Sequence, residues 1–157
     1  MIARVIGSLF LAMTLSLGVT GCGDDANRLY GSVSEVYPLD FDKVGVSLQG
    51  NFLVIEYTKA STATSAGKVA KLSVLTDGLM VKPGQAIDLT EMVGTASRGT
   101  LQRVLESTVE LTMMRGTLTL DGFPTAGKQL SGHFATTLSN PSGRTLNGDF
   151  QATVLQQ

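Results

Sequence analysis

Apolar and polar residues alternate along most of the chain from Leu29 onward, which is typical of strands with one buried face. Residues 44–48 and 53–57 alternate on either side of the turn sequence "QGN", so they predict a β-hairpin. Further strands are expected at 69–76 and, shorter, at 86–89. The small-residue segment "KASTATSAGK", residues 59–68, predicts a loop.

Residues 101–114, "LQRVLESTVELTMM", fit two patterns. Their first half has helical spacing, whereas their second half alternates and leads into the strand sequence "RGTLTLDG". We therefore expect two strands with a turn near 106–108, and a helix over the first half is the alternative.

The C-terminal part contains an internal repeat, "LSGHFATTL" at 130–138 and "LNGDFQATV" at 146–154. The turn-forming sequence "SNPSGRT" separates the two copies. Because the offset is even, both copies send the same set of side chains inward. That set is Leu130, Phe134, Leu138, Leu146, Phe150 and Val154. If the last leucine of the first copy pairs with the first leucine of the second, Phe134 lies opposite Phe150.

About eight or nine short strands with closely spaced turns predict an all-β fold, either an antiparallel β-sandwich or a small β-barrel. The four prolines all fall in expected loops, as a sheet requires. A chain of 157 residues is long enough for one domain with its own core, which we place at 29–157.

Residues 1–21 do not share this pattern. A cationic start at Arg4 precedes an uncharged run from Val5 to Val19 and then small residues. The run of about 15 residues is shorter than the roughly 20 that a membrane-spanning helix needs. It predicts a cleaved signal peptide for export.

The signal peptide ends in Val19, Thr20, Gly21 and Cys22, and Cys22 is the only cysteine of the chain. This sequence resembles the lipobox of bacterial lipoproteins, with Val where Leu is more usual. The resemblance implies cleavage between Gly21 and Cys22, a diacylglycerol on the Cys22 sulfur and an acyl chain such as palmitate on the freed amine. A plain secretory signal beside a free cysteine is the alternative, but an odd thiol is uncommon in an exported protein.

Residues 22–28, "CGDDANR", are then the lipidated cysteine and a short polar tether. At about 0.8 kcal/mol per buried methylene, two or three acyl chains hold the protein on a membrane without help from the domain. The residues after Cys22 span at most about 20 Å, so we expect the domain close to the lipid headgroups. In the sorting rule of some bacterial lipoproteins an Asp after the cysteine retains the protein in the inner membrane. With Gly23 there, the resemblance implies the outer membrane.

The charges are balanced, with twelve Lys and Arg against thirteen Asp and Glu, so nucleic acid is not an expected partner. Residues 122–129, "GFPTAGKQ", have the spacing of a phosphate-binding loop. That loop needs a hydroxyl after its lysine and a helix behind it, but Gln129 and an expected strand follow Lys128. We interpret the segment as a hairpin loop and expect no nucleotide.

His133 is the only histidine, and the repeat aligns it with Asp149 at an outward position. One histidine without a free cysteine does not make an ordinary zinc site, and a Ser-His-Asp triad would have to be built on a sheet face. Asp40 and Asp42 lack the pattern of a calcium loop. We therefore expect no metal, no cofactor and no catalytic residue.

Aromatic and methionine residues were the remaining candidates for binding. The chain has no Trp and three Tyr, one of which, Tyr57, alternates with core positions, so sugar recognition is disfavoured. Met80, Met92, Met113 and Met114 fit core filling, the usual role of Met, or an adaptable apolar surface or pocket.

Together these features predict a membrane-anchored lipoprotein of the bacterial cell envelope that acts as a binding or scaffolding module, with an envelope protein as partner. Its recognition loops would be 59–68 and 121–128 at one end of the sandwich. The alternative is a carrier or sensor of a small apolar ligand in a β-barrel, and an enzyme is third. A cavity of several hundred cubic ångströms would favour the carrier, and a solid core would favour the module.

Overall fold

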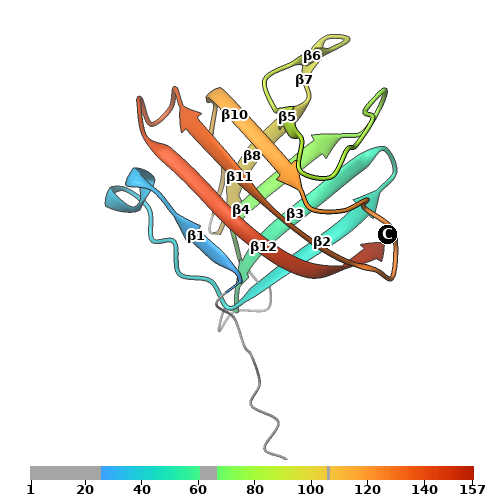
Figure 1. The fold of residues 1–157 in the computed structure, drawn as a ribbon. Helices are drawn as coiled ribbons and strands as arrows, with labels where there is room; N and C mark the ends of the chain where they lie inside the picture. Colours follow the sequence, from blue (N-terminus) through green and yellow to red (C-terminus); the bar gives the residue numbers. More distant parts are fainter. Residues whose placement is uncertain (1–25, 61–66, 106) are drawn as a thin grey trace, which may run out of the picture.

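Figure 1 shows the fold in the computed structural model, which describes residues 26–60, 67–105 and 107–157. The predicted signal peptide, the lipobox with Cys22, and residues 61–66 of the predicted loop lie outside the described residues. No helix in the described part of the chain is long and apolar enough to cross a membrane.

The described residues are almost entirely β-structure, as the alternation predicts. One short 3-10 helix, η1 (Ser32–Glu35), follows the first strand. The strands are β1 (Arg28–Tyr30), β2 (Lys43–Gln49), β3 (Phe52–Lys59), β4 (Gly67–Leu75), β5 (Ala86–Asp88), β6 (Met92–Val93), β7 (Ala96–Ser97), β8 (Gly99–Val104), β9 (Thr108–Glu110), β10 (Met113–Leu120), β11 (Gln129–Leu138) and β12 (Thr145–Gln156).

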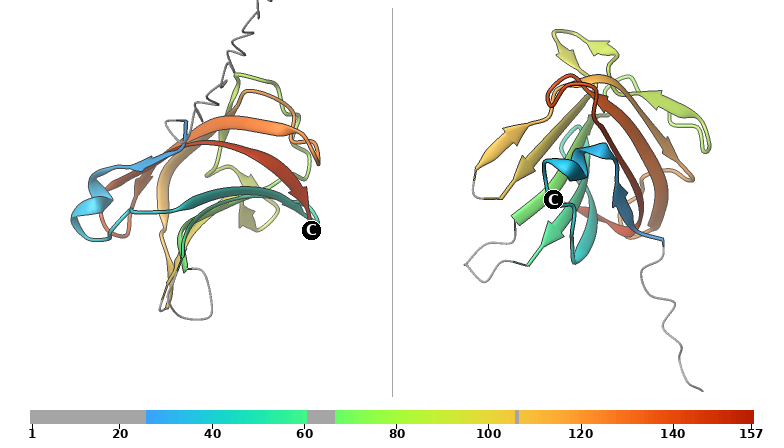
Figure 2. Two further views of the ribbon diagram at one scale, coloured as in Figure 1. Left: turned by 90° about the horizontal axis from the view of Figure 1, so that it is seen from below. Right: turned by 90° about the vertical axis from the view of Figure 1, so that its left-hand side faces the viewer.

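Ten of these strands form one sheet in the order β5-β10-β11-β12-β2-β3-β4-β8-β9, with β1 paired to β12. β12 belongs to both halves of this sheet, because residues 145–153 pair with β11 and residues 154–156 pair with β2. The two halves face each other across the core as a sandwich and do not close into a barrel (Figure 2). The β12–β2 pair is parallel, which the expectation of an antiparallel fold did not include.

The strands predicted from local patterns are confirmed. Val46 of β2 pairs with Ile55 of β3 in the expected hairpin, and both are buried. Residues 101–114 contain an antiparallel pair, β8 and β9, and the start of β10 rather than a helix. The described residues hold twelve strands instead of about nine, because β1, β6 and β7 are too short to show alternation.

The repeat forms the neighbouring strands β11 and β12, and all six predicted inward side chains are buried. The predicted pairing of Phe134 with Phe150 is wrong. Phe134 lies opposite Gly148, and Phe150 lies opposite Gly132. This register differs from the predicted one by two residues, so every side chain stays on its face.

The room beside two glycines explains this register. A Cβ atom at Gly148 would lie 2.8 Å from Phe134 Cζ and 2.6 Å from the Tyr57 hydroxyl oxygen. A Cβ atom at Gly132 would lie 2.8 Å from Phe150 Cζ. Each phenylalanine ring therefore occupies the room that a glycine of the other copy leaves free.

The domain begins earlier than the boundary at Leu29. Asn27 Oδ1 accepts a 2.7 Å hydrogen bond from the Gln151 backbone N–H. Arg28 Nη2 lies 2.6 Å from Asp149 Oδ2, and β1 starts at this residue. Two residues that we assigned to the tether are thus held by the sheet.

Candidate functional site

One hollow lies at the seam where β8 approaches β10 without a ladder of paired residues. Leu89, just after β5, joins the two strands through its backbone. Its N–H donates to the Gly116 carbonyl at 2.9 Å, and its carbonyl accepts from the Gly99 N–H at 2.7 Å. The Leu111 N–H donates to the Leu101 carbonyl at 2.9 Å, which extends the β8–β9 pair by one residue toward the seam.

The local sequence positions Leu89. The Asp88 carboxylate accepts bonds from the Thr90 N–H at 2.8 Å and the Thr90 hydroxyl at 2.7 Å, which form a tight turn around Leu89. These bonds lower the pKa of Asp88 below its ordinary value. A Cβ atom at Gly99 would lie 2.8 Å from Leu89 Cβ, and one at Gly116 would lie 3.1 Å from it. Two glycines inside strands thus let the buried Leu89 side chain enter the seam.

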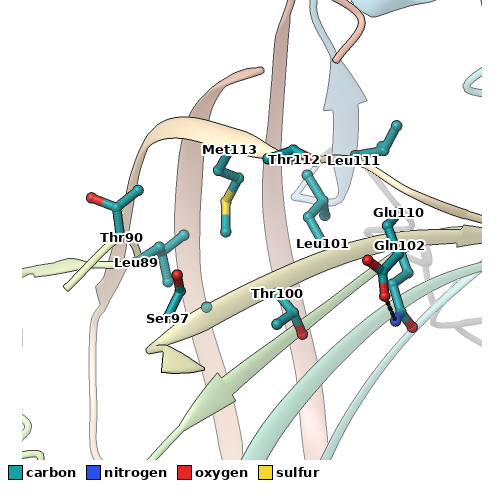
Figure 3. A pocket seen from close by; sticks show the side chains of 11 residues that line it. Leu89, Thr90, Ser97, Thr100, Leu101, Gln102, Glu110, Leu111, Thr112 and Met113 are labelled. Atoms are coloured by element: carbon teal, nitrogen blue, oxygen red, sulfur yellow. Dashed lines mark hydrogen bonds between the residues drawn. The ribbon is translucent and has the colours of Figure 1, made fainter. Parts of the chain in front are cut away.

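Beside Leu89 the seam opens into a pocket of about 240 Å³ (Figure 3). Met113 extends into it between Leu89 and Leu101. The rim is polar and holds Thr90, Ser97, Thr100, Gln102, Glu110 and Thr112. Gln102 Nε2 lies 3.5 Å from Glu110 Oε1, a long contact that leaves both groups able to bind another partner.

Size and lining limit what this seam pocket can hold. Its volume is below the roughly 300 Å³ at which small-molecule sites begin, and its floor is apolar. Among the described residues that line it, Glu110 is the one with an ionisable side chain. The pocket therefore has room for about one apolar side chain and has hydrogen-bonding groups at its rim.

Two exposed methionines flank the segment that carries Leu89. Met80 is 83% exposed, and Met92, in the β6–β7 hairpin, is 61% exposed. The usual role of Met in core filling is wrong for these two residues and for Met114, which is 54% exposed. We call Met80, Met92 and the seam pocket the distal site, because the β6–β7 hairpin lies at the end of the domain opposite the start of β1 (Figures 1 and 2).

His133 is exposed on the outer face of β11, as predicted, and pairs in register with Asp149. The Asp149 carboxylate is held by Arg28, and the Ser131 hydroxyl donates to Asp121 at 2.8 Å. The His133 side chain makes no hydrogen bond to another described residue. These groups do not form a Ser-His-Asp triad.

The predicted loop carboxylates have local partners. Asp42 Oδ2 accepts from the Ala60 N–H at 2.6 Å, and Asp40 lies 3.8 Å from Lys59 Nζ. Within residues 26–60, 67–105 and 107–157, no three His, Cys, Asp or Glu side chains are grouped to hold a metal ion.

The described borders of the predicted loop 59–68 and the predicted loop 121–128 lie at opposite ends of β2. Lys59 ends the strand β3 next to Lys43, the first residue of β2. Residues 121–128 form the hairpin loop between β10 and β11, with a strand and no helix after them. The Gly127 N–H donates to the Val154 carbonyl, and β12 runs from there along the last residues of β2.

Two buried arginines were missed by sequence reasoning. Arg98 donates to the carbonyls of Leu75 and Asp77 and pairs with Glu91 at 2.7 Å, which fastens the base of the β6–β7 hairpin to β4. Arg103 donates to the carbonyls of Pro38 and Val69.

The setting of Arg103 explains its burial. Its guanidinium lies 5.2 Å from the centre of the Tyr37 ring, and burial lowers its pKa. Gly99, Leu101 and Arg103 alternate along β8 and are all buried, so the period of two was the sequence feature that indicated an inward position for Arg103.

The sequence matches no protein-family model, no curated protein and no solved structure.

Proposed function

We propose that this protein is a lipid-anchored binding or scaffolding module of the bacterial cell envelope, held in the outer membrane by acyl chains on Cys22. The observation that carries the proposal is the sequence Val19, Thr20, Gly21 and Cys22 at the end of an export signal. Lipidation accounts for the one thiol of an exported chain.

The fold is compatible with passive binding. Twenty buried hydrophobic residues fill the space between the two halves of the sheet. A solid interior of this kind supports a module that binds at its surface over a carrier with an internal ligand cavity. The β6–β7 hairpin, which carries Met92, lies at the end of the domain opposite the start of β1, where it is open to an envelope protein.

The anchor is tested by the variant Cys22→Ser, followed by separation of membranes from soluble envelope contents. We expect the wild-type protein in the membrane fraction and the variant in the soluble fraction, because a hydroxyl does not form the thioether. The double variant Cys22→Ser/Ser34→Cys keeps one thiol, at an exposed position, and is expected to be soluble too. A Cys22→Ser protein that stays with the membrane like the wild type contradicts the proposal.

The binding surface is tested by a photo-crosslinking amino acid placed at Met92 in the lipidated protein. Thr153, exposed near the end of β12, is the matched control position. We expect a discrete crosslinked partner from Met92 and none from Thr153. Equal crosslinking from both positions would contradict the assignment of the distal site.

A further inference from the structure

A second hollow, of about 550 Å³, lies where the described chain begins. Its walls are residues 27–30 on one side and residues 39–41 on the other. Leu29, Leu39 and Phe41 are half-buried at its floor, and Tyr30 is 47% exposed at its edge. We call these seven residues the tether-side groove.

The groove follows from the topology of the sheet. β1 pairs with β12 at residues 147–149, whereas β2 pairs with β12 only at residues 154–156. The two halves of the sandwich therefore diverge at this end, and β12 is the one described strand that pairs with β1. Phe41 packs edge-on against the buried Tyr57, with ring centres 5.0 Å apart, so the floor of the groove is the margin of the core.

The charged groups at the rim are paired. Arg28 binds Asp149 with a distance of 2.6 Å, and Lys59 lies 3.8 Å from Asp40. Arg28 also lies over the Tyr30 ring, 5.6 Å from its centre. An apolar floor with an amphipathic aromatic residue and neutralised charges at its rim is typical of surfaces that rest in a membrane interface.

The length of chain before the domain restricts what this surface can face. Asn27 is fastened to Gln151, so only Gly23 to Ala26 separate Cys22 from the sheet. Four extended residues span about 13 Å. If acyl chains on Cys22 lie in the bilayer, the groove must lie at the level of the headgroups.

We propose that the tether-side groove is a membrane-seating surface, which places Tyr30 and the apolar floor in the interface of the bilayer that holds Cys22. This inference rests on the proposed lipid anchor and adds the orientation of the domain: the groove faces the lipid and the distal site faces away. Because the rim charges are paired, the seating depends on apolar contact and changes little with salt.

The absence of Trp from the sequence allows a direct test. The variants Tyr30→Trp and Met92→Trp each carry one tryptophan, at the groove and at the distal site. Both positions are exposed, so neither substitution disturbs the core. Each full-length lipidated protein is reconstituted into phosphatidylethanolamine and phosphatidylglycerol vesicles with brominated acyl chains, and fluorescence quenching is measured.

We expect at least about twofold stronger quenching, with a blue-shifted emission, for Tyr30→Trp, because residues seated in the interface lie about 5–10 Å into the headgroup boundary. Raising the salt concentration should leave this difference unchanged. If both proteins remain in the vesicles and their tryptophans are quenched equally, the membrane seating is wrong and the anchor stands. If the wild-type protein separates from the vesicles, the proposed function itself is wrong.

Discussion

Gly132 and Gly148 lie where the phenylalanine rings of the repeat cross the neighbouring strand. Each glycine faces the phenylalanine of the other copy. The Tyr57 ring lies edge-on to Phe134, with centres 6.1 Å apart, and its hydroxyl donates to the Asp149 carbonyl at 2.7 Å. The packing of the core near β12 thus depends on these two glycines, which leave room for the rings, as much as on the large side chains themselves.

The variant Gly148→Ala should destabilise the fold by about 1–3 kcal/mol, because the new methyl group overlaps Phe134 and Tyr57. Gly45→Ala is the matched control, since a Cβ atom there would have no neighbour within 4 Å. We expect Gly45→Ala to be neutral or stabilising by about 0.5–1 kcal/mol. Urea denaturation of both proteins measures the difference, and equal effects would contradict the packing described for Gly148.

Tyr57 should give stability a measurable pH dependence. Burial, and then the nearby Asp149 charge, raise the pKa of Tyr57 above its ordinary value. The unfolded chain loses this proton above about pH 10 while the folded chain keeps it, so stability is lost as pH rises beyond that point.

The variant Tyr57→Phe should therefore make the fall in unfolding free energy above about pH 10 shallower by about 1.4 kcal/mol per pH unit. It should also lose about 0.5–1.5 kcal/mol at neutral pH with its hydrogen bond. If the unfolding free energies of the wild type and Tyr57→Phe fall with equal slopes between pH 9 and about 11.5, the result would be inconsistent with a raised pKa of Tyr57.

At the scale of elements, two features hold the sandwich together. β12 joins the halves on one side, and the backbone of Leu89 links β10 to β8 on the other. The Leu89 side chain is fully buried between Gly99 and Gly116. The seam pocket exists because this link is a single residue rather than a full strand.

The variant Leu89→Ala should cost about 2–5 kcal/mol, because it leaves a cavity next to the seam pocket. Met92→Ala, in the exposed hairpin beside it, should change stability by less than about 0.5 kcal/mol. Thermal or urea unfolding checks both values. A Leu89→Ala protein as stable as Met92→Ala would show that the seam is not closed by this side chain.

Local patterns predicted where the strands lie better than which strands pair and in what register. The β2–β3 hairpin and the inward set of the repeat follow from alternation, which depends only on neighbouring residues. The register of β11 and β12 does not, because a shift of two residues preserves both faces and the fit of ring to glycine decides it. The parallel β12–β2 pair joins distant segments that carry no local signal.

The distal site was harder to foresee than the fold. Gly99 and Gly116 within strands were a usable sign of close approach, but they do not say which residue approaches. Met80 and Met92 are compatible with a core or a surface position, and only the fold distinguishes these. Arg103 points inward at a position where the alternation predicts an apolar residue. Its burial is possible because it donates hydrogen bonds to carbonyl groups at the edge of the core.

At the scale of the whole molecule, the two ends of the domain have different proposed roles. The tether-side groove lies next to the predicted lipid anchor, and the distal site lies at the opposite end. Both proposals depend on a single covalent event, the proposed acylation of Cys22, which would bring the start of β1 to the membrane.

Intact mass spectrometry of the protein purified from its native membrane tests that event most directly. The account predicts a mature chain that begins at Cys22 and carries a diacylglycerol thioether on its sulfur. A chain with an unmodified Cys22 thiol, or with its N-terminus at another residue, would contradict it.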